Sequence, residues 1–333
     1  MLPPLGSWRR RTGPDEPVWR EHTEALFVAN IGSFRAPNVT RVKLSDGTTL
    51  SNPTRDDQRR IVRLRERALF SLTAWSTPKL GKHVAKTRVT SRDYETAEEE
   101  ARQRLHRLHL ALRLIKPGAV TLSGEMAYQP RVTFSVRRFT SWFPGGPLFA
   151  ARTRDYEFDA ADRPLFRRLY DGLAAVMVQA DIALRRFDMA NERETPEDRV
   201  VDYWVALESL FSRRGETELR YRFAMRIAYF MEEQSDRRLD LFNRLYDAYQ
   251  VRSDILHGGV SKRDVAQAEE VSAEALRASL RSLVVEGKRP DPDELDHRFG
   301  CLHVILPSLK LAEINHNFHP FPDKTDFAIP HYR

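Results

Sequence analysis

Two side chains with complementary chemistry stand five residues apart near the end of a segment whose pattern predicts a helix. Arg252 carries a guanidinium that stays charged at physiological pH and can hold a phosphate through two nitrogens, whereas the imidazole of His257 takes up and releases protons near neutrality. This combination suits RNA cleavage without a metal. The spacing alone is weak evidence, because arginine is abundant in the chain. An arginine followed after four to six intervening residues by a histidine also occurs as Arg102 or Arg104 with His109 and as Arg298 with His303.

The helix that carries this pair is predicted to run from Asp236 to about His257. Apolar residues at steps of three and four predict its buried stripe, which consists of Leu239, Phe242, Tyr246 and Tyr249. Arg252 lies one further step of three along that side, so we expect it to border the core.

His257 stands in the last helical turn before Gly258-Gly259, where a left-handed cap residue is easily adopted. The negative end of the helix dipole at this position favours a protonated imidazole, which suits a general acid. On an ideal helix, a step of five residues turns two side chains about 140° apart. Arg252 and His257 therefore meet at one phosphate only if the last turn unwinds or if two subunits pool their copies, and a homodimer is the simpler solution.

The elements around this segment predict an α+β protein in which a mixed α/β region, residues 1–158, precedes a helical bundle, residues 159–289, and a proline-rich extension, residues 290–333. The bundle is predicted from helical periods at 162–187, 198–211, 217–231, 236–257 and 261–285. In the first of these helices, Asp162 is the expected N-cap and one apolar stripe runs from Leu165 toward Ile182 and Phe187. In the last, Ser261 with Asp264 resembles a capping box.

The first region shows strand patterns at 26–31, 39–44, 83–90 and 131–137, with an Asp46-Gly47 hairpin turn, while residues 59–73 fit either a helix or a strand. A helix is predicted from Thr96 to Ile115, with one apolar face and a stop at Pro117-Gly118. Because Arg104 and His109 lie about 140° apart on this helix and no glycine follows His109, we expect His106 and His109 to be solvated or packing residues.

Composition limits the classes of function. The chain of 333 residues carries a formal net charge of +7, which favours a polyanionic partner such as RNA, although the charge also fits solvated helical faces. The best candidate for a membrane span, Leu173 to Leu184, is interrupted by two polar residues, and no signal peptide is evident, so we expect a cytoplasmic protein without membrane contact. Cys301 is the only cysteine, which excludes an intrachain disulfide.

Other sites of chemistry lack sequence support. There is no Walker loop, HExxH or GxSxG motif. His316, His319 and His331 lie near acidic residues in the extension, but the prolines there do not indicate a rigid metal site. No cofactor and no metal are therefore expected.

Two motifs together carry a family resemblance. The segment Trp204-Val-Ala-Leu-Glu208-Ser-Leu-Phe211, followed two helices later by Arg252-Ser-Asp-Ile-Leu-His257-Gly258, resembles the Apea-like branch of the HEPN superfamily. The resemblance covers roughly residues 160–285 and leaves the first 158 without a counterpart. It implies a helical bundle, a homodimer and a metal-independent endoribonuclease that acts in defence, toxin–antitoxin or RNA-processing systems.

The resemblance assigns the catalytic pair to Arg252 and His257. The RNA 2′-hydroxyl would attack its own phosphodiester, Arg252 would stabilise the charge, and His257 would protonate the leaving 5′-oxygen. Glu208 either orients Arg252 or faces water, and Ser253 and Asp254 are supporting candidates, although many superfamily members have Asn, Asp or His where this chain has Ser253.

Three arginines on the intervening helix, Arg220, Arg222 and Arg226, are candidates for RNA phosphate contacts or, alternatively, for an exposed basic face paired with Glu216 and Glu218.

Three interpretations of the whole chain remain open. It is an endoribonuclease whose first region senses a trigger or binds substrate, with an activating ligand or antitoxin as a further partner. It is a catalytically inactive RNA-binding or dimerisation module. Or the Arg, His and Gly residues only cap a helix, in which case His257 should lie in a packed core.

Overall fold

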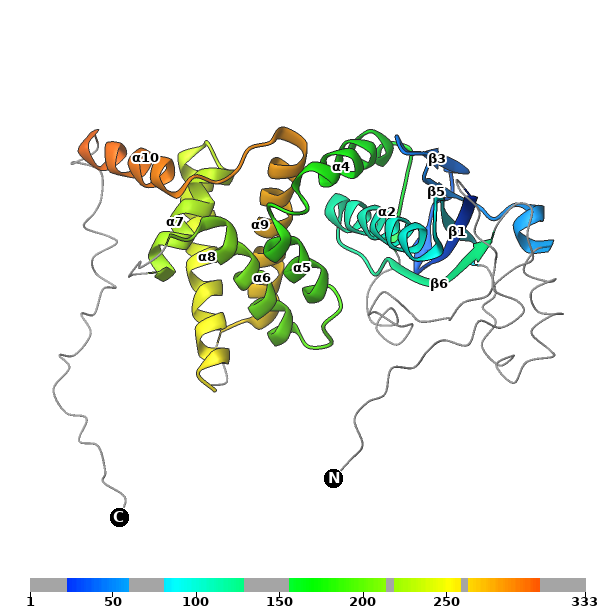
Figure 1. The fold of residues 1–333 in the computed structure, drawn as a ribbon. Coiled ribbons are helices and arrows are strands. Elements are labelled where there is room, and N and C mark those ends of the chain that lie inside the picture. Colours follow the sequence, from blue (N-terminus) through cyan, green and yellow to red (C-terminus); the bar gives the residue numbers. More distant parts are fainter. Residues whose placement is uncertain (1–22, 60–80, 129–155, 214–218, 259–262, 306–333) are drawn as a thin grey trace, which may run out of the picture. The chain divides into compact units, whose positions relative to one another are not determined.

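The computed structural model describes residues 23–59, 81–128, 156–213, 219–258 and 263–305 (Figure 1). Within these ranges an antiparallel sheet comes first and a series of helices follows, so the chain has the predicted α+β fold. The chain divides into two compact units, residues 1–290 and 291–333. The sheet and the helical bundle both belong to the first unit, and helix α10 (Pro292–Ile305) belongs to the second.

The main sheet has the strand order β3-β4-β5-β1-β6, with antiparallel neighbours throughout. Its strands are β1 (Thr23–Gly32), β3 (Arg41–Lys43), β4 (Thr49–Ser51), β5 (His83–Ser91) and β6 (Thr121–Tyr128). A short parallel ladder joins β2 (Phe34–Arg35) to β7 (Tyr156–Glu157). Three of the predicted strands are thus confirmed. The fourth, at 131–137, and nearly all of the ambiguous segment 59–73 lie outside the described residues.

The hairpin between β3 and β4 forms where Asp46-Gly47 predicted it. Gly47 has a φ of +83°, a left-handed conformation that glycine adopts without steric cost. The Asp46 carboxylate accepts a hydrogen bond from the Thr48 backbone amide at 2.9 Å, which closes the turn. This turn sets the register that pairs Val42 with Leu50.

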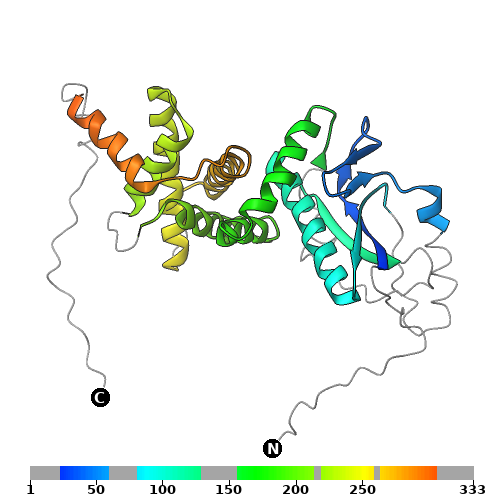
Figure 2. The ribbon, with the colours of Figure 1, turned by 45° about the horizontal axis from the view of Figure 1, so that its top comes forward.

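Helix α2 (Tyr94–Ile115) packs on one face of the sheet (Figures 1 and 2). The side chain of Asp93 caps it by accepting a hydrogen bond from the Thr96 amide at 2.7 Å. All five residues of its predicted apolar face are buried, namely Ala97, Ala101, Leu105, Leu108 and Leu112. They meet a sheet face that includes Phe27 and Val89, so the alternation of the strands and the period of the helix agree on one core.

The bundle follows in chain order. Its helices are α4 (Asp162–Val176), α5 (Asp181–Ala190), α6 (Pro196–Phe211), α7 (Leu219–Met231), α8 (Ser235–Leu256) and α9 (Val265–Arg281), and the π-helical turn η2 (Ser282–Glu286) extends α9. Helix α6 packs against α5, α8 and α9, and α8 also packs against α7. The expected helical bundle is therefore present among the described residues.

The long first helix of the prediction is two helices in the structure. Helix α4 ends at Val176 and α5 begins at Asp181, while Ile182, expected in the buried stripe, is 51% exposed. Residues 177–180 form a turn between the two helices, so the period of α4 does not continue to Ile182. Asp162 is the first helical residue rather than the N-cap, a position that Ala161 occupies without a side-chain hydrogen bond.

The buried face of α8 was predicted only in part: Tyr249 is buried as expected, and Phe242 and Tyr246 are half-buried. Leu239 is 52% exposed, and the core face contains Leu241, Leu245 and Ala248 instead. These steps of four and three lead on to Arg252, as does the predicted step of three from the buried Tyr249, so the expectation that Arg252 borders the core is confirmed. Aromatic side chains misled the pattern, because a long tyrosine or phenylalanine covers apolar surface while its residue remains partly exposed.

The start of α9 also differs from the prediction. Asp264 is the N-cap, and its carboxylate accepts hydrogen bonds from the amides of Ala266 and Gln267 at 2.9 and 3.1 Å. Ser261 lies outside the described residues. At the other end, Gly287 closes η2 in a left-handed conformation with φ +67°.

Candidate active site on helices α6 and α8

Helices α6 and α8 bring the two sequence motifs together. Thr195 caps α6 by accepting a hydrogen bond from the Asp198 amide, and Pro196 occupies the first turn. The buried Trp204 meets Tyr249 of α8 edge to face, with ring centroids 5.0 Å apart. One turn beyond Trp204, α6 presents Glu208 to α8.

Glu208 and Arg252 form an ion pair across these helices. The Nη2 atom of Arg252 lies 3.0 Å from Oε1 of Glu208 and donates a hydrogen bond to Oε2 at 3.3 Å. Both side chains are mostly buried, with 20% and 23% exposed. Burial raises the pKa of Glu208, and the charge of Arg252 and a hydrogen bond from Tyr249 oppose that rise. The contact is the geometry expected if Glu208 orients the guanidinium.

Arg252 retains capacity for a further acceptor. Its guanidinium carbon lies 5.3 Å from the centre of the Tyr249 ring, which limits how the side chain can swing. Glu208 occupies Nη2, while the buried Nε has no hydrogen-bond partner among the described residues. A guanidinium has five N–H donors, so an anion can still bind beside the carboxylate.

His257 is exposed at the C-cap of α8. Its backbone amide donates to the Ser253 carbonyl at 3.1 Å, and Gly258 follows in the predicted left-handed conformation with φ +76°. The last turn is therefore wound, and the angular separation of about 140° from Arg252 holds within one chain. An unwound last turn of α8, one of the two ways in which Arg252 and His257 could meet, is not observed. The other way is a site to which one subunit contributes Arg252 and a second subunit contributes His257.

The supporting candidates lie on either side of Arg252. Asp254 accepts a hydrogen bond from the amide of Gln250 at 2.6 Å, and Gln250 in turn accepts one from Arg220 at 2.6 Å. Ser253 is half-buried and its carbonyl accepts the His257 amide. Asp254 thus belongs to a polar chain that reaches α7, while Glu208 alone of the three candidates contacts Arg252 in the hydrogen bonds and ion pairs of the described residues.

The three arginines of α7 do not form one basic face. Arg226 is fully buried and donates to the Phe211 carbonyl at 2.9 Å, so its predicted contact with RNA is wrong. Arg220 lies 3.5 Å over the Tyr246 ring and donates to the Tyr246 carbonyl, and Arg222 is half-buried. The reason is that α7 is buried on most sides from Phe223 to Ala228, which turns Arg226 inward. Glu216 and Glu218, their alternative partners, lie outside the described residues.

A second charged cluster, which was not predicted from the sequence, joins α2 to α5. Arg113 forms ion pairs with Asp188 and with Glu192, the latter at 3.3 Å. His109, one turn earlier on α2, is fully buried against the Val120 carbonyl at 2.9 Å, which confirms its packing role. The signal in the sequence was a spacing of four residues, from His109 to Arg113 on α2 and from Asp188 on α5 to Glu192 just beyond its end.

The environment of this cluster shifts two pKa values in opposite directions. Burial lowers the pKa of His109 to about 3, with the charge of Arg113 as a second cause. Burial raises the pKa of Glu192 to about 7, against the attraction of Arg113. The cluster is a structural link between α2 and α5, and neither Arg252 nor His257 contributes to it.

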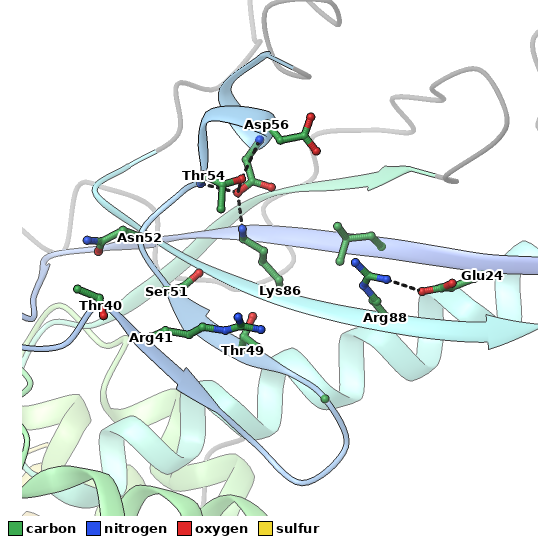
Figure 3. Close-up of a pocket in the computed structure, with 13 residues that line it drawn as sticks. Glu24, Thr40, Arg41, Thr49, Ser51, Asn52, Thr54, Asp56, Lys86 and Arg88 are labelled. Atoms are coloured by element: carbon green, nitrogen blue, oxygen red, sulfur yellow. Dashed lines mark hydrogen bonds and ion pairs between the residues drawn. The ribbon is translucent and has the colours of Figure 1, made fainter.

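A polar pocket lies on the sheet face opposite α2 (Figure 3). It has a volume of about 460 Å³, and cationic side chains from two strands line it, Arg41 from β3 and Lys86 and Arg88 from β5. Lys86 points to Asp57 and forms an ion pair with it, and Arg88 pairs with Glu24 at 2.9 Å (Figure 3). Most of the charge in this pocket is therefore already neutralised.

Comparison with known proteins does not assign the chain to a family. No family model, no curated protein and no solved structure matches the chain. Among the described residues, no helix is long and apolar enough to cross a membrane, and no group of three or more metal-ligating side chains is found. The histidines of the extension lie outside the described residues.

Proposed function

We propose that the protein is a metal-independent endoribonuclease of HEPN type that cleaves RNA by 2′-hydroxyl transesterification, in antiviral defence or stress response. The observation that supports the proposal is the Glu208–Arg252 ion pair, because it links the two motifs on which the resemblance rests and holds a guanidinium beside the helix end that carries His257. A mostly buried carboxylate that fixes an arginine is typical of an anion clamp.

The chemistry requires no cofactor. The 2′-oxygen attacks the phosphorus, the bond to the 5′-oxygen breaks, and the products are a cyclic phosphate and a free 5′-hydroxyl. Arg252 stabilises the additional negative charge of the transition state, and His257 moves the protons and delivers one to the 5′-oxygen. DNA lacks the attacking hydroxyl and should remain intact.

Arg252, which binds the phosphate, and His257, which transfers the protons, act on one phosphate in a homodimer. Within one chain the wound end of α8 separates them, so we infer that Arg252 of one copy and His257 of the other face the same groove. An activating ligand or an antitoxin would control this arrangement, and the first region of the chain would sense the trigger or bind substrate.

The first test is cleavage of single-stranded RNA by the purified protein in EDTA, with end-group analysis of the products. We expect cyclic phosphate ends, and a loss of about 10²–10⁴-fold in rate for Arg252→Ala and for His257→Ala. His257→Ala is the cleaner variant because the side chain is exposed. Arg244→Ala is the matched control, since Arg244 lies on the same helix and contacts only Asp240 among the ion pairs of the described residues.

An inactive RNA-binding or dimerisation module is the second candidate function. It is favoured by the fact that one chain does not align Arg252 with His257, and it predicts RNA that is bound but intact under all conditions. The third reading expected His257 in a packed core, whereas the side chain is exposed. Intact RNA in the presence of cell extract as a source of activator would contradict the nuclease proposal.

A further inference from the structure

A cavity of about 920 Å³ opens between the end of α2 and helices α6 and α9. Its wall includes charged and polar side chains that are almost fully buried, among them Arg277 at 7% exposed and Tyr203 at 3%. A cavity of this volume accommodates a small organic molecule. Burying charge is costly unless a partner compensates it, so the pairing of each group that faces the cavity indicates what the cavity can bind.

Among the described residues, Arg277 forms no ion pair with a carboxylate. Its Nε donates to the Arg113 carbonyl at 3.2 Å, and its guanidinium lies 6.0 Å from the Phe187 ring. Glu274, one turn earlier on α9, attracts Arg277 but forms no ion pair with it within the described ranges. Burial lowers the pKa of Arg277, which is the direction expected for a cation in need of an anion.

Tyr203 is the second group with unused capacity. Its hydroxyl has no hydrogen-bond partner in the described parts of the chain, and burial raises its pKa to about 12, against the nearby positive charge of Arg277. Both side chains line the same cavity, Tyr203 from α6 and Arg277 from α9, and each shifts the pKa of the other. An unpaired hydroxyl in a cavity wall is free to donate a hydrogen bond to a molecule that enters the cavity.

The other cations of the wall are occupied. Arg199 holds Glu269 through two hydrogen bonds of 2.7 and 3.0 Å, and Arg281 donates to the carbonyls at the end of α2. Arg113 pairs with Asp188 and Glu192. A buried Nε of Arg113 is also unpaired, but Arg113 already has two carboxylate partners. In the described residues both Nη atoms of Arg277 and the hydroxyl of Tyr203 make no hydrogen bond, so together these two side chains offer two guanidinium nitrogens and one hydroxyl to a single anion.

We propose that this cavity binds a small phosphate ester, with the phosphate held by Arg277 and Tyr203. Three donors match the three terminal oxygens of a phosphate monoester, whereas a carboxylate has two. The volume exceeds what inorganic phosphate fills, and Glu192, Glu270 and Glu274 in the same wall can accept hydrogen bonds from hydroxyl or amino groups of the remainder. The site shares no residue with the Arg252–His257 pair, so it does not depend on the nuclease proposal.

The test is isothermal titration of the full chain with AMP, with adenosine and inorganic phosphate as comparison ligands and no RNA present. We expect AMP to bind, adenosine to bind at least about tenfold more weakly, and Tyr203→Phe to weaken AMP binding by about tenfold, because the variant loses only the hydroxyl. Arg277→Lys should weaken it at least as much, since lysine lacks the planar pair of donors.

Tyr229→Phe is the control, because Tyr229 does not line the cavity, and it should bind AMP like the unmodified chain. If Arg277→Lys fails to fold, Tyr203→Phe decides alone. The proposal is overturned if neither AMP nor inorganic phosphate binds at millimolar concentration, if adenosine binds as tightly as AMP, or if Tyr203→Phe leaves the affinity for AMP unchanged.

Discussion

At the scale of single residues, His109 and Glu192 make opposite contributions to the pH dependence of stability. The pKa of His109 falls from 6.5 to about 3 on folding, so the unfolded chain binds a proton that the folded chain rejects as the pH falls below 6.5. This contribution to stability is lost toward acidic pH. The pKa of Glu192 rises from 4.5 to about 7, so the folded chain binds a proton first and stability increases as the pH falls from 7 to 4.5. The two slopes oppose each other between about pH 4.5 and 6.5.

Single substitutions should separate the contributions of His109 and Glu192 to the pH dependence of stability. We expect Glu192→Gln to lose stability relative to the unmodified chain as the pH falls from 6.5 to 4.5, and His109→Gln to gain it, each by on the order of 1 kcal/mol per pH unit. Urea unfolding at several pH values measures both. Parallel curves for the two variants would show that the environment of the cluster does not shift these groups.

The Glu208–Arg252 pair gives a second prediction at this scale. Glu208→Gln keeps the shape of the side chain but leaves a mostly buried guanidinium without its counter-charge, so the free energy of unfolding should fall by roughly 1–3 kcal/mol. Glu99→Gln, which removes a surface pair with Arg102 at 3.6 Å, should change it by less than about 0.5 kcal/mol. Denaturant titration compares the two, and equal effects would mean that Glu208 contributes no more than a surface charge.

At the scale of elements, helix α8 carries two leucines that lie six residues apart and differ sharply in burial. Leu245 is fully buried between neighbouring helices, whereas Leu239 is 52% exposed although its period matched the aromatic residues of the helix. The face that packs on α6 therefore decides where Arg252 points.

Substituting each leucine tests which face of α8 is buried. Leu245→Ala should lower the free energy of unfolding by about 2–5 kcal/mol through lost burial and a residual cavity, and Leu239→Ala by less than about 1 kcal/mol. Thermal unfolding of both variants gives the comparison. If Leu239→Ala lowered the free energy of unfolding more than Leu245→Ala, the buried face of α8 would be the one that contains Leu239.

At the scale of the whole molecule, the proposed active site depends on a second copy of the chain. If the Arg252 of one copy works with the His257 of the other, a mixed dimer of Arg252→Ala and His257→Ala chains contains one site with both functional residues and one with neither. After the chains exchange at random, half of the dimers are mixed, and each mixed dimer has one functional site out of two.

Mixing the two inactive variants after mild unfolding and refolding should therefore restore about a quarter of the unmodified cleavage rate. The measurement is RNA cleavage by each variant alone and by the mixture at equal total concentration. A mixture that stays inactive, while the unmodified chain cleaves, would place both residues of each site in one chain.

The sequence by itself determined the α+β class, the main strands and helices of the described regions, the Asp46-Gly47 turn and the end of α8 just before Gly258, because these depend on local periodicity and on residues with special backbone preferences. It also identified Arg252, His257 and Glu208 as candidates. Only the tertiary structure decided that Arg226 is internal, that Leu245 rather than Leu239 is core, and that Arg277 and Tyr203 share a cavity with unused donors. These outcomes depend on which helices pack together, and packing joins residues far apart in the chain through contacts that no local pattern contains.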